Sequence, residues 1–218
     1  MRLPMMARYR LSTLSVLALA GVLLAGCAGE STRPAALQQT SELRSSPFVP
    51  TDAQKALVGV SDGTYTFDVD PNVNQSLTLG ASHLDIPAYA VCDLDESTYG
   101  PGHWDEDCKP QGRRFKLTAV VRNAATDHPS VDFQPALRFS PNKNVNLYLF
   151  VTDDATLDAS RVVKYCNATG CVDESIADPS LASSVDLENR VVFRRIKHFS
   201  GYLVSTFAEV EGALPGLL

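Results

Sequence analysis

The sequence has no hydrophobic run long enough to cross a bilayer comfortably. Its longest apolar stretch, from Leu11 to Leu24, contains two serines, a threonine and a glycine. A membrane-spanning helix takes about 20 consecutive apolar residues. Acidic residues are also missing before Glu30, whereas arginines occupy positions 2, 8 and 10. A basic start, a short apolar middle and a small-residue end predict a secretory signal peptide.

The end of this leader resembles a known export signal. Leu24-Ala25-Gly26-Cys27 is similar to the lipobox of bacterial lipoproteins, which implies acylation of the Cys27 sulfur and cleavage before Cys27. One acyl chain holds a protein only marginally, whereas two or more anchor it stably. We therefore expect a lipid anchor at Cys27 in the bacterial cell envelope. Ala28 stands where Asp often retains such proteins at the inner membrane, which favours the outer membrane. The alternatives are an ordinary signal peptide or an uncleaved anchor.

Motifs for common catalytic chemistry are also missing. The chain has four histidines but no Gly-x-Ser-x-Gly, no His-Glu-x-x-His, no phosphate-binding loop and no dinucleotide fingerprint. We expect no enzyme and no cofactor.

Basic residues are scarce. Residues 1–26 hold three arginines and no acid, so the rest of the chain carries 16 basic and 25 acidic side chains, a formal charge of −9. Nucleic acids reward clustered Lys and Arg, and we exclude them as partners. The one basic cluster, Arg194-Arg195-Ile196-Lys197, is interpreted as a solvated strand face.

No Cys-x-x-Cys pair is present, and no histidine has the spacing of a zinc module. Apart from Cys27, the chain has four cysteines, at positions 92, 108, 166 and 171. An even number in an exported chain predicts two disulfides, for which three pairings exist. Proximity in the sequence favours Cys92–Cys108 and Cys166–Cys171.

Helical periodicity is rare, and short alternating segments dominate. The clearest are 114–122, 131–139 and 145–151. Pro135 cannot donate to a strand ladder, so we expect the second segment at a sheet edge or with a bulge. The expected fold is all-β, an antiparallel β-sandwich of about eight or nine short strands. A helical turn is expected in 52–57, capped by Thr51 or Asp52, and another within 174–184.

These patterns divide the chain into four parts. They are a signal peptide at 1–26, a lipidated flexible tether at 27–58, a β-sandwich at 59–210 and a C-terminal tail at 211–218.

Three stretches resemble the ZU-type β-sandwich family, in its exported bacterial branch. They are His83-Leu-Asp-Ile-Pro-Ala-Tyr-Ala-Val91, the run from Phe133 through Pro141 to Leu149, and His198-Phe199-Ser200-Gly201-Tyr202. The resemblance covers residues 60–205, although a disulfide loop replaces the family's short acidic turn. It implies a structural or interaction module without enzymatic activity.

The same resemblance raises a chemical alternative at His198-Phe199-Ser200. Some ZU-type domains cut their own chain between Phe and Ser, with the serine hydroxyl attacking the preceding carbonyl and histidine assisting. The structural alternative places Phe199 in the core and His198 on the outer face.

The segment between Cys92 and Cys108 offers two further interpretations. Its acidic residues could supply oxygen ligands to Ca²⁺, the candidates being Asp93, Asp95, Asp105 and Asp107. Its aromatic residues could contact a glycan or a protein partner, the candidates being Tyr99, His103 and Trp104. Alternatively the acids are solvated and Trp104 caps one end of the sandwich. The predicted function is a membrane-anchored, non-enzymatic envelope module with an unknown protein or glycan partner.

Overall fold

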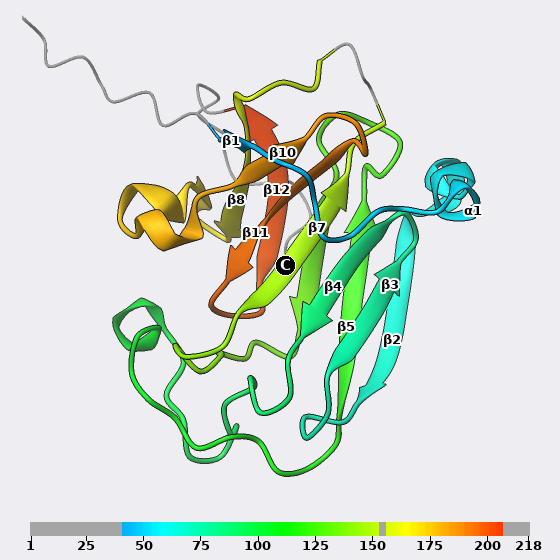
Figure 1. Cartoon of the computed structure of the whole chain (residues 1–218). Helices are drawn as coiled ribbons and strands as arrows, with labels where there is room; N and C mark the ends of the chain where they lie inside the picture. The colour runs from blue at the N-terminus through cyan, green and yellow to red at the C-terminus, as the bar shows by residue number, and fades with distance from the viewer. Residues whose placement is uncertain (1–40, 153–155, 207–218) are drawn as a thin grey trace, which may run out of the picture. The chain divides into compact units, whose positions relative to one another are not determined.

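A computed structural model describes residues 41–152 and 156–206 of the chain. The leader, Cys27 and the C-terminal tail lie outside the described residues. The described part is all-β, with two six-stranded sheets (Figure 1). Sheet A runs in the order β1 (Glu42–Leu43), β10 (Ser184–Asp186), β11 (Val191–Ile196), β7 (Val145–Phe150), β4 (Ser82–Ile86) and β3 (Gln75–Leu79). Sheet B runs in the order β2 (Gly63–Val69), β5 (Phe115–Arg122), β6 (Ser130–Gln134), β12 (Gly201–Thr206), β8 (Arg161–Asn167) and β9 (Gly170–Val172).

In residues 41–152 and 156–206, helical structure is confined to short turns. These are α1 (Asp52–Ala56) and the 3₁₀ turns η1 (Val58–Val60), η2 (Pro101–His103), η3 (Glu174–Ile176) and η4 (Pro179–Leu181). Thr51 caps α1 with a capping box to Gln54, as the sequence predicts. Within the described residues, no helix is both long and apolar enough to cross a membrane.

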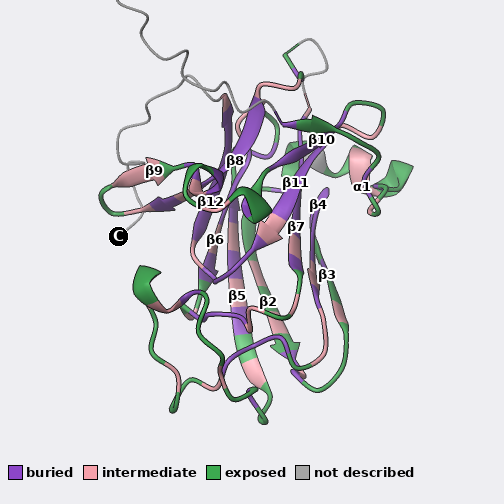
Figure 2. Ribbon diagram, turned by 60° about the vertical axis from the view of Figure 1, so that its left-hand side comes forward, coloured by how far each residue is buried: buried purple, intermediate pink, exposed green. Residues whose placement is uncertain are grey.

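The core lies between the two sheets, so the fold is sandwich-like. Leu84, Leu147 and Val192 of sheet A belong to the same buried cluster as Phe133 and Val204 of sheet B. Figure 2 shows the buried residues concentrated on the strands of both sheets. Alternation along each strand explains this arrangement, since every second side chain faces the opposite sheet.

The outer face of sheet A carries a second apolar cluster. Residues 41–50, here called the N-terminal strap, run along this face, with β1 pairing in parallel to β10. The Phe48 ring stacks on His83 at 4.3 Å between ring centroids and packs against Tyr148. The strap therefore covers apolar surface on the side of sheet A that faces away from sheet B, although it belongs to the segment expected to be a flexible tether.

Two predictions about strands are wrong. The described residues hold twelve strands rather than eight or nine, because the two- and three-residue strands β1, β9 and β10 are too short to show an alternation. The strand preceding Pro135 is neither at an edge nor bulged. It is β6, which pairs with both β5 and β12 and ends at Gln134, so the proline follows the ladder rather than interrupting it.

The two predicted disulfides are confirmed. Cys92–Cys108 closes a loop with a sequence separation of 16, and Cys166–Cys171 joins facing residues of β8 and β9 with a separation of 5. The first bond ties down a long segment without regular strands, and the second fixes the β8–β9 hairpin.

Candidate functional site

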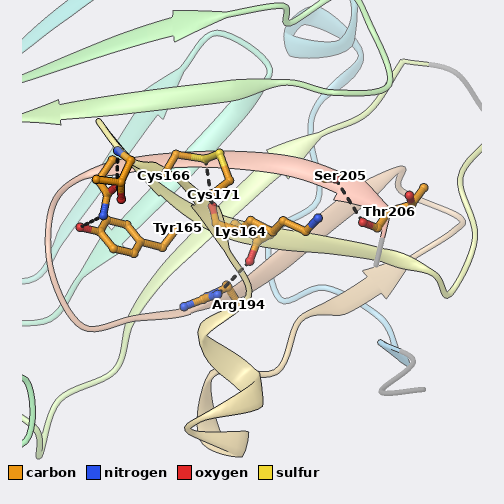
Figure 3. The surroundings of a disulfide bond; sticks show 10 residues. Lys164, Tyr165, Cys166, Cys171, Arg194, Ser205 and Thr206 are labelled. Atoms are coloured by element: carbon orange, nitrogen blue, oxygen red, sulfur yellow. Dashed lines mark hydrogen bonds between the residues drawn. A yellow bond between two sulfur atoms is a disulfide. The ribbon is translucent and has the colours of Figure 1, made fainter. Parts of the chain in front are cut away.

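A cleft of about 720 Å³ opens beside the end of β8 and β9. We call it the Trp104 cleft. One wall comes from the Cys92–Cys108 loop, and the other comes from the hairpin and the two 3₁₀ turns that follow it. Its lining consists of Pro101, Trp104, Asp105, Lys164, Tyr165, Cys171, Val172, Asp173, Glu174, Ile176, Ala177, Asp178, Leu181 and Lys197. Figure 3 shows the disulfide at this site with Tyr165, Lys164 and Arg194 around it.

Both walls of the Trp104 cleft are fixed by local structure. Asp173 caps η3 by accepting from the Ser175 N–H, and Asp178 caps η4 by accepting from the Ser180 N–H. Such caps satisfy backbone donors that a short helical turn leaves without a partner. On the opposite wall, the loop is held by its disulfide and by Arg138, whose guanidinium donates to the Glu106 and Asp107 carbonyls.

The cleft presents apolar surface to solvent. Val172 and Ile176 are 54% and 67% exposed, and the other apolar lining residues extend this surface inwards. Exposed aliphatic side chains gathered around a concave site are typical of surfaces that bind a partner or ligand.

Asp173 is the unusual polar group of the cleft. The residue is only 9% exposed, and its Oδ1 accepts from the Ser175 N–H at 2.9 Å. Its Oδ2 is buried and has no hydrogen-bond partner among the described residues. Leaving a buried acceptor unpaired costs about 1–3 kcal/mol, and more for a charged group. Asp173 lines the cleft, so a donor that reached this oxygen from the cleft would stabilise it.

Glu174 connects the cleft to the domain interior. Its Oε2 accepts from Arg194 Nη2 at 2.5 Å, and its Oε1 faces His198 Nε2 at 3.0 Å. Burial pushes the pKa of Glu174 upwards, but the hydrogen bond from His198 and the charge of Arg194 outweigh it, so the net shift is downwards. Glu174 is therefore held as a carboxylate, with the Arg194 guanidinium as its countercharge.

Lys197 is a buried cation that pairs with acidic residues of both cleft walls. It is only 6% exposed, and its ammonium contacts both Asp105 and Asp178. Burial alone would lower the pKa of Lys197, but the two carboxylates raise it above the usual value. This triad joins the Cys92–Cys108 loop to η4 across the cleft. The expectation that the Arg194–Lys197 cluster is a solvated strand face is wrong for Arg194 and Lys197, which are buried, whereas Arg195 is half-buried.

The expected outer-face position of His198 is wrong as well, because this residue is completely buried. Its ring stacks on Trp104 at 4.2 Å between centroids, and Tyr165 meets it edge-on at 4.8 Å. Trp104 is itself only 8% exposed. The indole therefore forms the floor of the cleft and closes this end of the core, while one of its faces is already occupied.

Phe199 lies in the core, as the structural alternative predicts, and its ring packs on Phe133 and Phe139. The Tyr99 hydroxyl donates to the Phe199 carbonyl at 2.8 Å. Burial raises the pKa of Tyr99 to about 12, which keeps this hydroxyl protonated as a donor.

The histidine of the proposed self-cleavage motif has other partners. His198 Nε2 faces Glu174, and Nδ1 lies 3.4 Å from the Tyr202 hydroxyl, which also donates to the His198 carbonyl at 2.7 Å. No hydrogen bond between His198 and Ser200 occurs in the described part of the chain. The geometry is that of a buried network which fixes the β11–β12 turn.

The acidic residues proposed for calcium point to different partners. Asp93 Oδ1 accepts from the Asp95 N–H, and Asp95 pairs with Arg113 at 2.6 Å. Asp105 pairs with Lys197, and Asp107 accepts from Asn142. Across residues 41–152 and 156–206, no group of three or more His, Cys, Asp or Glu side chains converges as metal ligands would.

Two of the three proposed contact residues, Tyr99 and Trp104, are in contact. The Tyr99 and Trp104 rings meet edge-on at 4.8 Å between centroids. His103 faces away into an exposed pair with Glu106 at 2.8 Å. Of the three, Trp104 lines the cleft, and Tyr99 contacts the Trp104 ring.

Reasoning from the sequence missed the other wall of the cleft. Glu174 and Asp178 fall within the helical turn expected in 174–184, whereas Asp173 lies just before it and no expectation covers it. Two short Asp-x-Ser patterns, Asp173–Ser175 and Asp178–Ser180, are typical of capped turns and could have located both 3₁₀ turns. Nothing local in the sequence shows that Glu174 meets Arg194 or that Asp178 meets Lys197.

Comparison with known proteins gives no further guide to this site, since no protein-family model, no curated protein and no solved structure matches the chain.

Proposed function

We propose that this chain is a lipid-anchored lipoprotein of the bacterial envelope whose β-sandwich-like domain is a non-enzymatic binding module. Its ligand site is the Trp104 cleft. The observation that carries this proposal is the buried Asp173 Oδ2, which has no partner among the described residues and belongs to a cleft with an apolar lining.

The charges around the cleft define what it can hold. Four of its lining residues are acidic, and two are lysines. Glu174 is paired with Arg194 and contacts His198 Nε2, and Asp105 and Asp178 share Lys197. Asp173 is thus the carboxylate whose second oxygen is left to a ligand. A cationic donor suits it best, because hydrogen bonds to charged groups contribute about 1.5–3 kcal/mol.

The apolar surface restricts the ligand further. Val172 and Ile176 flank the opening, so a bound molecule gains by covering aliphatic area at about 25 cal/mol per Å². A peptide segment with a Lys or Arg between apolar residues combines both properties. Stacking of a sugar on Trp104, the glycan alternative, has less support, because His198 occupies one face of the indole.

Trp104 provides the measurement, since it is the only tryptophan of the chain and lines the cleft. Purified protein is titrated with the capped tripeptide Leu-Lys-Leu and with Leu-Glu-Leu as its charge-reversed control, and the fluorescence of Trp104 is recorded. We expect a saturable change with the lysine peptide alone. D173N, which retains an amide able to cap η3, should weaken binding at least tenfold.

The matched control is D158N, because Asp158 caps its own turn through Ser160 and is not part of the cleft lining. It should bind like the unaltered protein. Equal binding of both peptides, or equal binding to D173N, would contradict the proposal. A saturable response to oligosaccharides but not to peptides would replace it with the glycan alternative.

A further inference from the structure

A second cleft, of about 350 Å³, lies on the outer face of sheet A. We call it the arginine cleft. It contains Arg44 of the N-terminal strap, Asn144 and Asn146 at β7, Ser184 of β10, and Phe193 and Arg195 of β11. In the sheet register Arg195 stands opposite Asn146, and Phe193 stands opposite Ser184. These residues therefore share one patch of three neighbouring strands.

The polar groups of this cleft can all donate hydrogen bonds, and none of them is acidic. They are guanidinium, amide and hydroxyl groups, and none of its described lining residues carries a carboxylate. The chain has a formal net charge of −6, so this positively charged cleft has the opposite sign to the chain as a whole. An oxyanion is the ligand that guanidinium and amide donors jointly suit.

Arg195 supplies the strongest single indication. Its Nη2 donates to the Pro141 carbonyl at 2.6 Å, which fixes the guanidinium. Its Nε is buried and has no hydrogen-bond partner among the described residues. A buried N–H without an acceptor costs free energy, and an anion oxygen that reached it from the cleft, which Arg195 lines, would satisfy it.

Arg44 approaches the same place from the strap. Its guanidinium lies 5.4 Å from the centre of the Phe193 ring, a cation–π distance. The only ion pair recorded for it within the described residues is with Glu42 at 3.7 Å, and both side chains are more than half exposed. Exposed pairs of this kind are weak, so an incoming anion can compete with Glu42.

The third arginine of the cleft, Arg194, is already committed. Its guanidinium donates to Glu174 and to the Val163 carbonyl on the opposite side of the sheet. The cationic pair available to a ligand is therefore Arg44 and Arg195, one from the strap and one from β11.

From this arrangement we infer that the arginine cleft binds a phosphate-type oxyanion. The site is separate from the Trp104 cleft, and the inference does not depend on the ligand proposed there. Two sources carry this chemistry, a free phosphate or pyrophosphate and the phosphodiester of a lipid headgroup.

The test uses the full chain with C27S in every arm, so that no acyl chain contributes. Binding of inorganic phosphate and pyrophosphate is measured by calorimetry. Binding to phosphatidylglycerol vesicles, with phosphatidylcholine vesicles for comparison, is measured by co-sedimentation. R195Q removes the guanidinium that carries the unpaired Nε, and R195K retains the charge without the planar fork. R113Q serves as the matched control. It also removes one arginine, but Arg113 pairs with Asp95 of the Cys92–Cys108 loop.

We expect R195Q to weaken oxyanion binding at least tenfold, R195K and R44Q to weaken it less, and R113Q to leave it unchanged. Saturable binding of phosphate or pyrophosphate with this ranking identifies a free oxyanion. The same ranking with vesicles alone identifies a lipid headgroup. Absence of binding in both arms, or equal loss in R113Q and R195Q, overturns the inference. Thermal melting of each variant separates lost binding from lost folding.

Discussion

Three buried ionisable side chains lie close together in the sequence near the C-terminal end of the domain. Arg194, Lys197 and His198 are all buried, and each has a carboxylate partner contributed by the segment from Glu174 to Asp178 or by Asp105. Buried charges persist only when they are paired. The basic run that reads as a solvated strand face is instead the binding partner of the turns that build the Trp104 cleft.

Asp178 makes this network sensitive to acid. Burial opposes its ionised form, but hydrogen bonds from Lys197 and Ser180 dominate and lower the pKa of Asp178 to about 2. A carboxylate with a depressed folded-state pKa stabilises the protein fully above its usual value of 3.8, and this contribution is lost as the pH falls through the folded pKa. We expect D178N to lower the free energy of unfolding at pH 7 by about 1 kcal/mol and to flatten its fall between pH 4 and 2.

The measurement is urea unfolding of both proteins at pH 7, 4, 3 and 2. Because Asn can still accept from the Ser180 N–H, the η4 cap is retained and only the charge changes. Parallel pH curves for D178N and the unaltered protein would contradict the assigned role of Asp178.

Among the elements, the long strands were predictable and the short ones were not. The strand β5 alternates over its eight residues, and Val145, Leu147 and Leu149 of β7 are apolar at every second position, so period two is visible in the sequence. The strand β1 has two residues and β10 has three, and their pairing follows from tertiary contacts alone. The same applies to Phe48, whose stacking on His83 joins positions far apart in the sequence.

The two disulfide-closed elements should differ in what they contribute to stability. Chain-entropy estimates give about 3 kcal/mol for the Cys92–Cys108 separation of 16 and about 2 kcal/mol for the Cys166–Cys171 separation of 5. We expect paired Cys→Ser variants to lose free energy of unfolding in this order, as measured by urea titration under non-reducing conditions. Equal losses, or the reverse order, would show that contacts other than loop closure decide the contribution. Both bridges hold walls of the Trp104 cleft, so either loss should also weaken binding of the lysine peptide.

At the scale of the whole molecule, the two clefts place opposite charges on separate surfaces. The Trp104 cleft presents an unpaired carboxylate oxygen beside β9, and the arginine cleft presents guanidinium groups on the outer face of sheet A. The strap links the second surface to the proposed anchor. Only 13 residues separate Cys27 from Ser41, and even a fully extended chain of this length spans no more than about 50 Å. A lipid on Cys27 would therefore hold Ser41, where the strap begins, within about 50 Å of the bilayer.

Holding the domain near the bilayer in this way requires a lipid on Cys27, and this requirement can be tested directly. Cells producing the unaltered chain should show it in the membrane fraction with labelled palmitate incorporated, because two or more acyl chains give stable anchoring. C27S should incorporate no label and should leave the membrane fraction, since the acidic mature chain has little electrostatic attraction to an anionic surface. The paired C92S and C108S variant is the control. It removes two cysteines that form a disulfide but leaves Cys27 intact, so it should stay in the membrane fraction. Retention of C27S in the membrane without label would contradict the lipid anchor as the sole attachment and would indicate either an uncleaved leader or a contact through the arginine cleft.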